Sequence, residues 1–179
     1  MMTTPPIAVR LVGDSLEEAD LALRYAQWLE RIADMHQDAH ALANSVPAFA
    51  APRTALDAAR VGLLTSAGAY VEGDEAFDVA DPHGDPSFRV IPDDVDLSAI
   101  RFAHSHYDTS RAEQDPNVVL PLSPLHELVA TGEVGASAPR HIAMMGFNPD
   151  PRRLVAESVP KIVDLLRGDD VDIVVLSPG

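Results

Sequence analysis

The 179-residue sequence contains no cysteine, which excludes disulfides, cysteine-ligated zinc, iron–sulfur clusters and a thiol nucleophile among these residues. Lysine is scarce too, because Lys161 is the only lysine among 13 basic residues. The 28 acidic residues outnumber these basic ones and give a formal charge of −15. A field of this sign repels phosphate backbones and anionic lipid. We therefore expect neither nucleic acid nor a membrane surface as a partner.

Long apolar runs are also missing. No stretch of about 18 apolar residues occurs, and the N-terminus lacks the apolar core of a secretory signal. We therefore expect a cytoplasmic protein. The sequence likewise lacks the Gly-x-Gly-x-x-Gly and Gly-Lys-Ser/Thr motifs of nucleotide sites and the Gly-x-Ser-x-Gly motif of esterases. Its composition, 46% hydrophobic and 23% charged, is that of a globular protein.

The N-terminal part of the chain predicts a long amphipathic helix. Ser15 and Glu18 form a capping-box pattern at its start. Apolar residues then recur at three- or four-residue spacing as far as Asn44: Leu21, Tyr25, Trp28, Ile32, Met35, Ala39 and Leu42. We expect this stripe to dock on the rest of the chain or on a second subunit. Residues 1–58 are therefore predicted to be a helical arm and connector, and residues 59–179 an α/β domain.

Within that domain, apolar runs alternate with helical patterns. We expect strands at residues 60–66, 100–104, 142–145 and 172–177, a strand or extended segment at 118–122, and helices at 124–131 and 154–166. Residues 72–98 are rich in Asp, Pro and Gly and predict a long loop around one short apolar run at 88–91. Because no hairpin signals separate the strands, the pattern favours a mostly parallel sheet flanked by helices.

The histidines are the main candidates for chemistry. His104 and His106 lie two residues apart, so on an extended chain they share a face, and Asp108 follows on the same side. Two imidazoles with a nearby carboxylate are typical of a divalent metal site or of general-base catalysis. The alternative is that these imidazoles only bond the local backbone. We take His104, His106 and Asp108 as catalytic candidates, and a divalent metal on the two histidines as the candidate cofactor.

Three further positions complete the candidate site. His141 is expected to converge with the histidine pair, and Arg140 to anchor a substrate carboxylate. Thr65 and Ser66 follow the central strand, on the side where open α/β sheets bind ligands, and are candidates for substrate binding. Other polar clusters are interpreted as structural. Among them, the acidic group at residues 93–96 is expected to be a solvated loop, since it lacks the pattern of a calcium site.

From Ala59 onward, the chain resembles the selenoprotein B family of glycine, sarcosine, betaine and D-proline reductases. The matching stretches keep their order along the chain and lie at residues 61–68, 77–78, 81–89, 104–108, 115–121, 132–135, 139–141, 145–146 and 171–179. The resemblance implies an α/β fold, a small amine or amino acid as substrate, and assembly as a homo-oligomer or with a partner subunit. It also implies a selenocysteine or cysteine just after the last strand, where this sequence ends at Gly179.

In such reductases a low-pKa selenolate or thiolate would attack carbon next to an activated amine. Without that residue, three hypotheses about the protein remain open. The sequence is part of a longer reductase chain, or it is a redox-neutral enzyme centred on the histidines, or it is a non-catalytic subunit.

Overall fold

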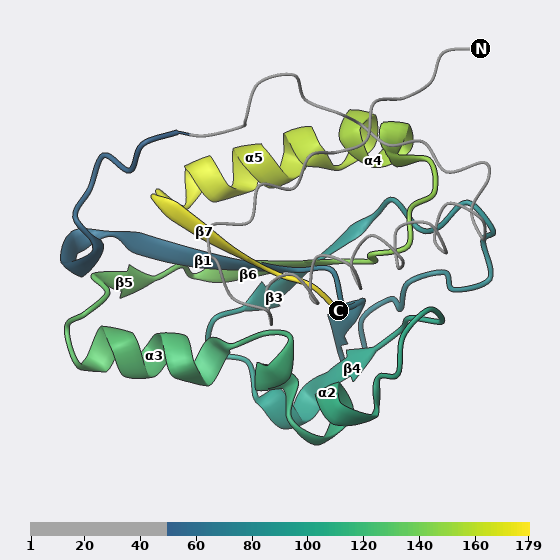
Figure 1. Ribbon diagram of the computed structural model, residues 1–179, viewed down its shortest axis with the longest axis horizontal. Helices are drawn as coiled ribbons and strands as arrows, with labels where there is room; N and C mark the ends of the chain where they lie inside the picture. The colour runs from purple at the N-terminus through teal and green to yellow at the C-terminus, as the bar shows by residue number, and fades with distance from the viewer. Residues whose placement is uncertain (1–49) are drawn as a thin grey trace, which may run out of the picture. The chain divides into compact units, whose positions relative to one another are not determined.

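The structure is a computed structural model in which residues 50–179 are described (Figure 1). The predicted N-terminal helix at residues 15–44 lies outside the described residues. None of the helices among residues 50–179 combines the length and the apolar character needed to cross a bilayer.

The described strands form a five-stranded sheet around a central strand, β1 (Arg60–Thr65). On one side, β7 (Ile173–Ser177) pairs with β1 in parallel. On the other side, β5 (Ala136–Ser137) and then β6 (Arg140–Met144) pair in parallel with the first and last residues of β1. The last strand, β3 (Phe88–Pro92), pairs with β6 in the antiparallel direction. The α/β class is therefore confirmed, whereas the sheet is mixed rather than purely parallel.

A separate two-stranded antiparallel sheet is formed by β2 (Ala69–Val71) and β4 (Ile100–Phe102). The strand predicted at residues 100–104 therefore ends two residues early, and His104 lies in the loop that follows it. Periodicity alone did not show this pairing, because three-residue strands are too short to display an alternating pattern.

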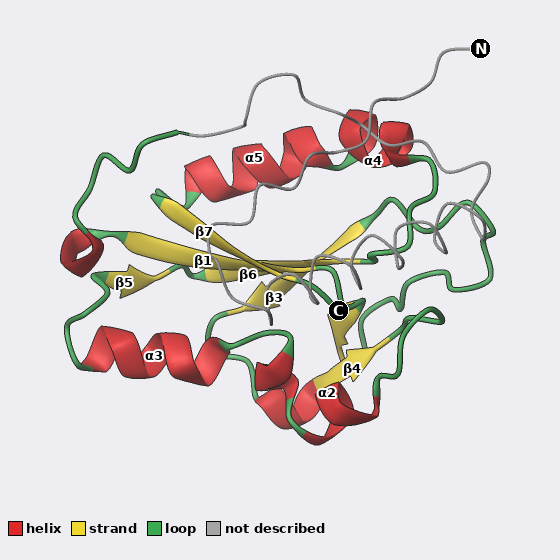
Figure 2. Cartoon of the chain, viewed as in Figure 1, coloured by secondary structure: helices red, strands yellow, loops and turns green. Residues whose placement is uncertain are grey.

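Helices cover both faces of the main sheet (Figures 1 and 2). On one face lie α4 (Pro151–Glu157) and α5 (Val159–Gly168), and on the other lies α3 (Leu122–Ala130), with the short α2 (Ser110–Gln114) beside β4. Three single-turn 3₁₀ helices complete the described elements: η1 (Leu56–Ala58), η2 (Leu97–Ala99) and η3 (Pro116–Val118).

Two helix predictions need correction. Residues 118–122 were expected to be a strand or extended, but Val118 ends η3 and Leu122 begins α3. The 3₁₀ turn forms because the Asp115 side chain caps its start and Pro116 fixes a helical φ. The helix expected at 154–166 is two helices that meet at Ser158. Pro160 lies in the first turn of α5, where a proline is tolerated, but its missing N–H prevents one helix from running through.

The main hydrophobic core lies between the sheet and α3. It is built from side chains that are at most 5% exposed, among them Val61, Leu63, Ile91, Leu120, Leu122 and Leu125. The opposite face is also closely packed: at Gly62 of β1, an added Cβ would lie 3.3 Å from the Val171 side chain and 3.5 Å from the Leu166 side chain of α5. Residues at the ends of the strands are therefore held by a well-packed scaffold.

Candidate functional site at the carboxyl edge of the sheet

The carboxyl ends of β1, β6 and β7 meet at one edge of the sheet. The Ser66 N–H donates to Ser177 O (3.0 Å), and the Gly68 N–H donates to Met144 O (2.9 Å). In addition, the Gly179 N–H donates to Ser66 Oγ (3.3 Å). Ligands of open α/β sheets bind at this edge, so the side chains gathered here form the candidate site.

Gly68 brings the histidine-bearing loop to this edge. Its φ is +71°, and an added Cβ would lie 2.3 Å from Ala103 O, a contact that no side chain tolerates. The close approach lets the Ala103 N–H donate to Gly68 O (2.9 Å), which fixes the chain just before His104. Further along the loop, the Tyr107 hydroxyl donates to Ala67 O (3.0 Å). The loop is therefore tied to the end of β1 at two points.

Four rings form a continuous cluster at this edge. The His106 ring stacks on Phe147 with centroids 3.6 Å apart and planes inclined by 10°. His104 meets Tyr107 edge-on at 4.7 Å, and the two histidine rings are 6.0 Å apart at 84°. His106 is exposed, whereas the other three are half-buried. This cluster offers flat apolar surface together with imidazole nitrogens, as suits a small polar ligand.

The protonation of His104 follows from its contacts. Its Nδ1 accepts the His106 backbone N–H (3.1 Å), so in the neutral ring the proton is on Nε2. Burial, aided by the neighbouring His106, lowers the pKa of His104 and favours this neutral form. His104 therefore offers an N–H donor to a ligand, and it is suited to bind an anionic group such as a carboxylate.

The same contacts bear on the metal prediction. A neutral histidine that binds metal through Nε2 carries its proton on Nδ1. In His104 the Nδ1 atom accepts the His106 N–H, so the proton is on Nε2 and that atom is not free to bind a metal. Among residues 50–179, no three His, Asp or Glu side chains gather as metal ligands. The present arrangement of His104 and His106 does not form a chelate, and a divalent metal stays a prediction from the sequence.

The remaining candidates near this edge have different environments. Asp108 Oδ1 accepts the Ser110 N–H (3.0 Å) at the start of α2, and this bond lowers the pKa of Asp108. Thr65 is fully buried, with Oγ1 accepting the Ala67 N–H (3.2 Å). Ser66 is half-buried with its hydroxyl at the edge. Of the three, Ser66 is the one whose hydroxyl lies at the carboxyl edge.

The structure does not bring His141 to the histidine pair, so the expected convergence was wrong. His141 is fully buried on β6, where its Nδ1 accepts the Leu63 N–H (3.0 Å) from the middle of β1. Its Nε2 therefore carries the proton and donates to Asp93 Oδ1 (2.9 Å). Both ring nitrogens are used inside the core, so His141 holds β1, β6 and the end of β3 together.

Asp93 is the centre of this second cluster, although it was expected in a solvated loop. Its Oδ1 also accepts the Ser137 hydroxyl (2.6 Å) and lies 2.8 Å from His126 Nε2. Burial by itself raises the pKa of Asp93, but the hydrogen bonds from Ser137, His126 and His141 outweigh it and lower the pKa. The sequence did not show this role because β3 places Asp93 beside His141 only through the antiparallel pairing.

Burial makes the stability of the fold depend on pH. It lowers the pKa values of His141 and His104, against the opposing effect of Asp93 on His141. An unfolded histidine binds its proton near pH 6.5, so below that pH the unfolded state holds more protons and stability falls. We expect the free energy of unfolding to decrease from pH 7.5 to 5.5, by at most about 1.4 kcal/mol per pH unit per histidine. Urea unfolding at both pH values checks this, and equal stability would contradict it.

Arg140 forms an ion pair with Asp169. Its Nε and Nη2 donate to the Asp169 carboxylate at 2.9 and 2.5 Å, and this pairing lowers the pKa of Asp169. Arg60 Nη1 donates to the Asp169 carbonyl (2.8 Å). Arg140 is the first residue of β6, and its guanidinium fork is occupied by Asp169, which follows α5, so the structure does not bring Arg140 to the carboxyl edge.

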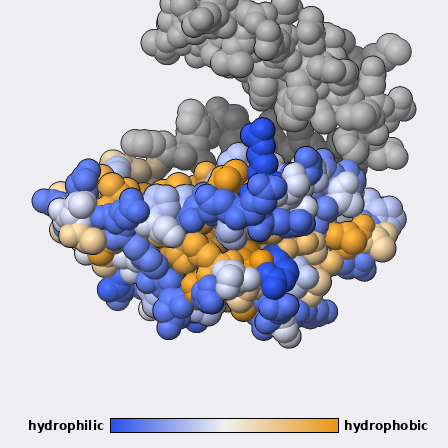
Figure 3. Space-filling view, turned by 90° about the horizontal axis from the view of Figure 1, so that it is seen from below, coloured by the Kyte–Doolittle hydropathy of each residue, from blue (hydrophilic) through white to orange (hydrophobic). Residues whose placement is uncertain are grey.

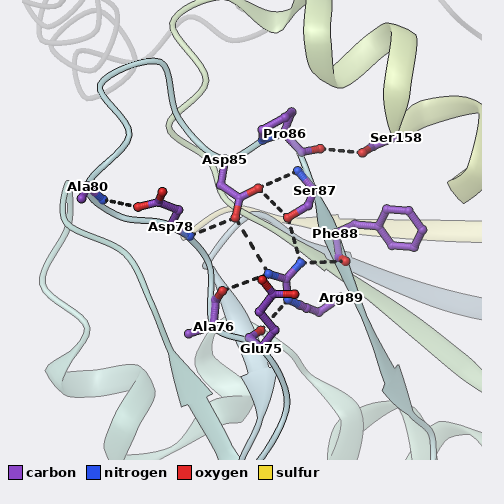
Figure 4. Close-up of polar contacts among 10 residues, drawn as sticks. All are labelled: Glu75, Ala76, Asp78, Ala80, Asp85, Pro86, Ser87, Phe88, Arg89 and Ser158. Carbon is purple, nitrogen blue, oxygen red and sulfur yellow. Dashed lines mark hydrogen bonds and ion pairs between the residues drawn. The ribbon is translucent and has the colours of Figure 1, made fainter.

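The long loop before β3 is held by one arginine (Figure 4). Arg89 has a side chain 14% exposed and lies with its guanidinium carbon 4.4 Å from the centroid of the Phe77 ring. All of its nitrogens find acceptors: Nε donates to Glu75 O (2.6 Å), Nη1 to Ser87 Oγ (2.8 Å) and Phe88 O (3.1 Å), and Nη2 to Ala76 O (3.0 Å), with Asp85 at 3.8 Å. This arginine therefore fixes the loop in one conformation.

That loop in turn supports the ring cluster. Gly84 has a φ of +75°, and an added Cβ would lie 2.0 Å from Phe147 O. The loop backbone thus packs directly against the residue whose ring stacks on His106. Sequence reasoning missed Phe147 because no local pattern links it to His106, 41 positions earlier; only the meeting of β1 and β6 at one edge does so.

These features define an α/β domain with a cluster of histidine and aromatic side chains at the carboxyl edge of its sheet, which is the candidate site for a small ligand. No family model matches the sequence, and no solved structure matches it. The chain is, however, 35% identical over 119 residues to the D-proline reductase subunit gamma of Acetoanaerobium sticklandii. The match covers 66% of this chain but only 48% of that protein, so the chain spans about half the length of the curated relative it matches. This supports the resemblance to reductase subunits; selenoprotein B itself stays a prediction.

Proposed function

We propose that this chain is a subunit of a reductase complex and that it binds a small amine or amino acid at the carboxyl edge of its sheet. The observation that carries the proposal is the 35% identity, over two-thirds of the chain, to a protein named as a D-proline reductase subunit. That protein's name implies a cyclic amino acid as substrate and further subunits as partners. We extend both to this chain as parts of the proposal.

The geometry of the edge supports a ligand of this kind. An amino acid carries a carboxylate and an amine on a small carbon frame. The protonated Nε2 of His104 is a donor suited to the carboxylate, and the Ser66 hydroxyl lies at the same edge. The exposed His106 ring, stacked on Phe147, provides a flat surface for the carbon frame. Together these groups can orient a small polar molecule.

The role proposed for these residues is binding and positioning. Residues 1–179 include no cysteine, so a thiolate or selenolate that attacks the substrate would come from another segment or subunit. Positioning of the reacting carbon lowers the barrier by holding the two groups in contact, whichever chain supplies the nucleophile. His104 and His106 would hold the amino acid still during that attack.

Calorimetric titration with D-proline, glycine, sarcosine and betaine tests the proposal. We expect one of these compounds to bind. His106→Ala should weaken that binding about tenfold, or by about 1.4 kcal/mol, because it removes the exposed ring of the stacked pair. The matched control is His126→Ala, which removes a partly exposed histidine from α3 and leaves the edge intact. If none of the four binds, or if both variants bind equally well, the site is wrongly placed.

A further inference from the structure

Strand β7 is an open edge among the described residues, where it pairs only with β1. Its sequence, Ile-Val-Val-Leu-Ser, contains no charge, proline or bulge, the features by which natural edge strands prevent pairing with another chain. Val175 is 42% exposed and Leu176 is 71% exposed. Since successive side chains of a strand point to opposite faces, apolar surface is open on both faces of this edge.

An apolar groove of about 310 Å³ adjoins this strand. Ile173 and Val175 of β7 form one wall, and Leu125 and Leu128 of α3 form the other. Figure 3, which views the molecule from the side where α3 lies, shows apolar surface gathered amid hydrophilic surface. The groove and the strand edge therefore form one continuous apolar surface, which we call the β7 surface.

We propose that a second copy of this chain occupies the β7 surface, with the two β7 strands pairing antiparallel about a two-fold axis at Val175. The two sheets then become one. The pairing is isologous, as in most soluble dimers, because each copy presents the same strand to the other. This inference stands apart from the proposed function, because none of the ligand-binding side chains belongs to β7.

The backbone of β7 has the right register for this pairing. The Ser177 carbonyl of β7 accepts the Ser66 N–H (3.0 Å), so the peptide groups of Ser177 point toward β1. Because the peptide groups of successive residues alternate in direction along a strand, those of Ile173 and Val175 also point toward β1, whereas those of Val174 and Leu176 point to the open edge. A two-fold axis at Val175 then makes Val175 and the partner's Val175 a pair without mutual hydrogen bonds. On each side of it, Val174 of one copy and Leu176 of the other form a hydrogen-bonded pair, in which the outward N–H and C=O groups satisfy each other.

Charge favours the antiparallel direction. Acidic residues gather before β7, at Asp169, Asp170 and Asp172, whereas residues 173–179 carry no charged side chain. With the axis at Val175, Asp172 lies opposite the partner's Pro178, since 172 + 178 is twice 175. The two acidic segments then lie at opposite ends of the interface. Parallel pairing would place them side by side, which is costly in a chain with a net charge of −15.

The packing is complementary as well. On the face of the groove, Val175 meets its own copy, and the two apolar grooves join across the axis. On the other face, Leu176 lies beside the partner's Val174, so the most exposed large apolar side chain of the described residues is covered. Aliphatic β-branched pairs of this kind stabilise antiparallel strands.

The oligomeric mass of the full chain tests this inference. We expect light scattering to give twice 19.2 kDa for the wild type and 19.2 kDa for Val175→Lys, because a charge on an edge strand blocks pairing. The matched control is Val155→Lys, which changes a valine of similar exposure (44%) on α4 and should remain dimeric. Circular dichroism reports whether each variant is folded. A monomeric wild type, or a folded Val175→Lys dimer, would overturn the inference.

A cross-linking variant decides the register without a destabilising charge. The chain has no cysteine, so Val175→Cys introduces a single thiol. Antiparallel residues that lie opposite each other without mutual hydrogen bonds have Cα atoms about 4.5 Å apart, within the range that a disulfide spans. Mild oxidation should convert Val175→Cys into a covalent dimer and leave Val155→Cys largely monomeric. If Val175→Cys does not cross-link, or if both variants cross-link equally, a second copy does not occupy the β7 surface as proposed.

Discussion

His141→Ala should destabilise the fold by about 3 kcal/mol, one of the two largest effects expected of a single substitution in this chain. The substitution leaves the buried Leu63 N–H without its acceptor, which costs about 1–3 kcal/mol, and opens a cavity beside β1. It also removes one of three donors from Asp93. Chemical unfolding at pH 7.5 measures the change.

His126→Ala is the matched control, because it removes a second histidine from the same Asp93 oxygen. The His126 side chain is 44% exposed, and water replaces its contact, so we expect a loss of less than about 1 kcal/mol. A similar loss for the two variants would mean that the bond between His141 and the Leu63 N–H contributes little. The account of His141 as a structural residue would then fail.

Arg89→Ala should cost about 2–4 kcal/mol and release the loop before β3. Hydrogen bonds from a charged group contribute about 1.5–3 kcal/mol, and Arg89 donates two of them to backbone carbonyls of the loop, at Glu75 and Ala76. Since Gly84 of this loop packs on Phe147, the variant should also weaken ligand binding at the edge. Unfolding by urea and limited proteolysis of residues 72–87 measure the two consequences.

Arg101→Ala provides the comparison for that variant. Arg101 also bonds two carbonyls and one carboxylate, but its side chain is 43% exposed, so we expect a loss of less than about 1 kcal/mol and no faster proteolysis of the loop. If Arg89→Ala leaves the loop as resistant as the wild type, then Arg89 is not what holds it.

The fold was predictable where a pattern is long enough to carry information. The apolar runs at β1 and β7 and the helical pattern at α3 predicted elements within two residues of their observed bounds. The direction of β3 was not predictable, because a buried strand has the same apolar composition whether it runs parallel or antiparallel. The pairing of β3 with β6 depends on contacts between residues about 50 positions apart.

The candidate site was likewise predictable only in part. His104 and His106 were candidates because of their two-residue spacing, and Ser66 because it stands at the end of a central strand, where this class of fold binds ligands. The structure places all three near the carboxyl edge. His141 and Arg140 were assigned to the same site on residue type alone, and the structure pairs them instead with Asp93 and Asp169. A buried histidine needs two partners, and neither partner can be read from its neighbours in the chain.

The central claim is that a small amine or amino acid binds at the carboxyl edge of the sheet. Nuclear magnetic resonance of the full chain, titrated with D-proline and the three related amines, tests it most directly. The account predicts that one of them shifts the amide signals of Ser66, His106, Phe147 and their neighbours, while those of Leu63 and His141 stay in place. Signals that do not move with any of the four, or that move only around Asp93 and His141, would contradict it.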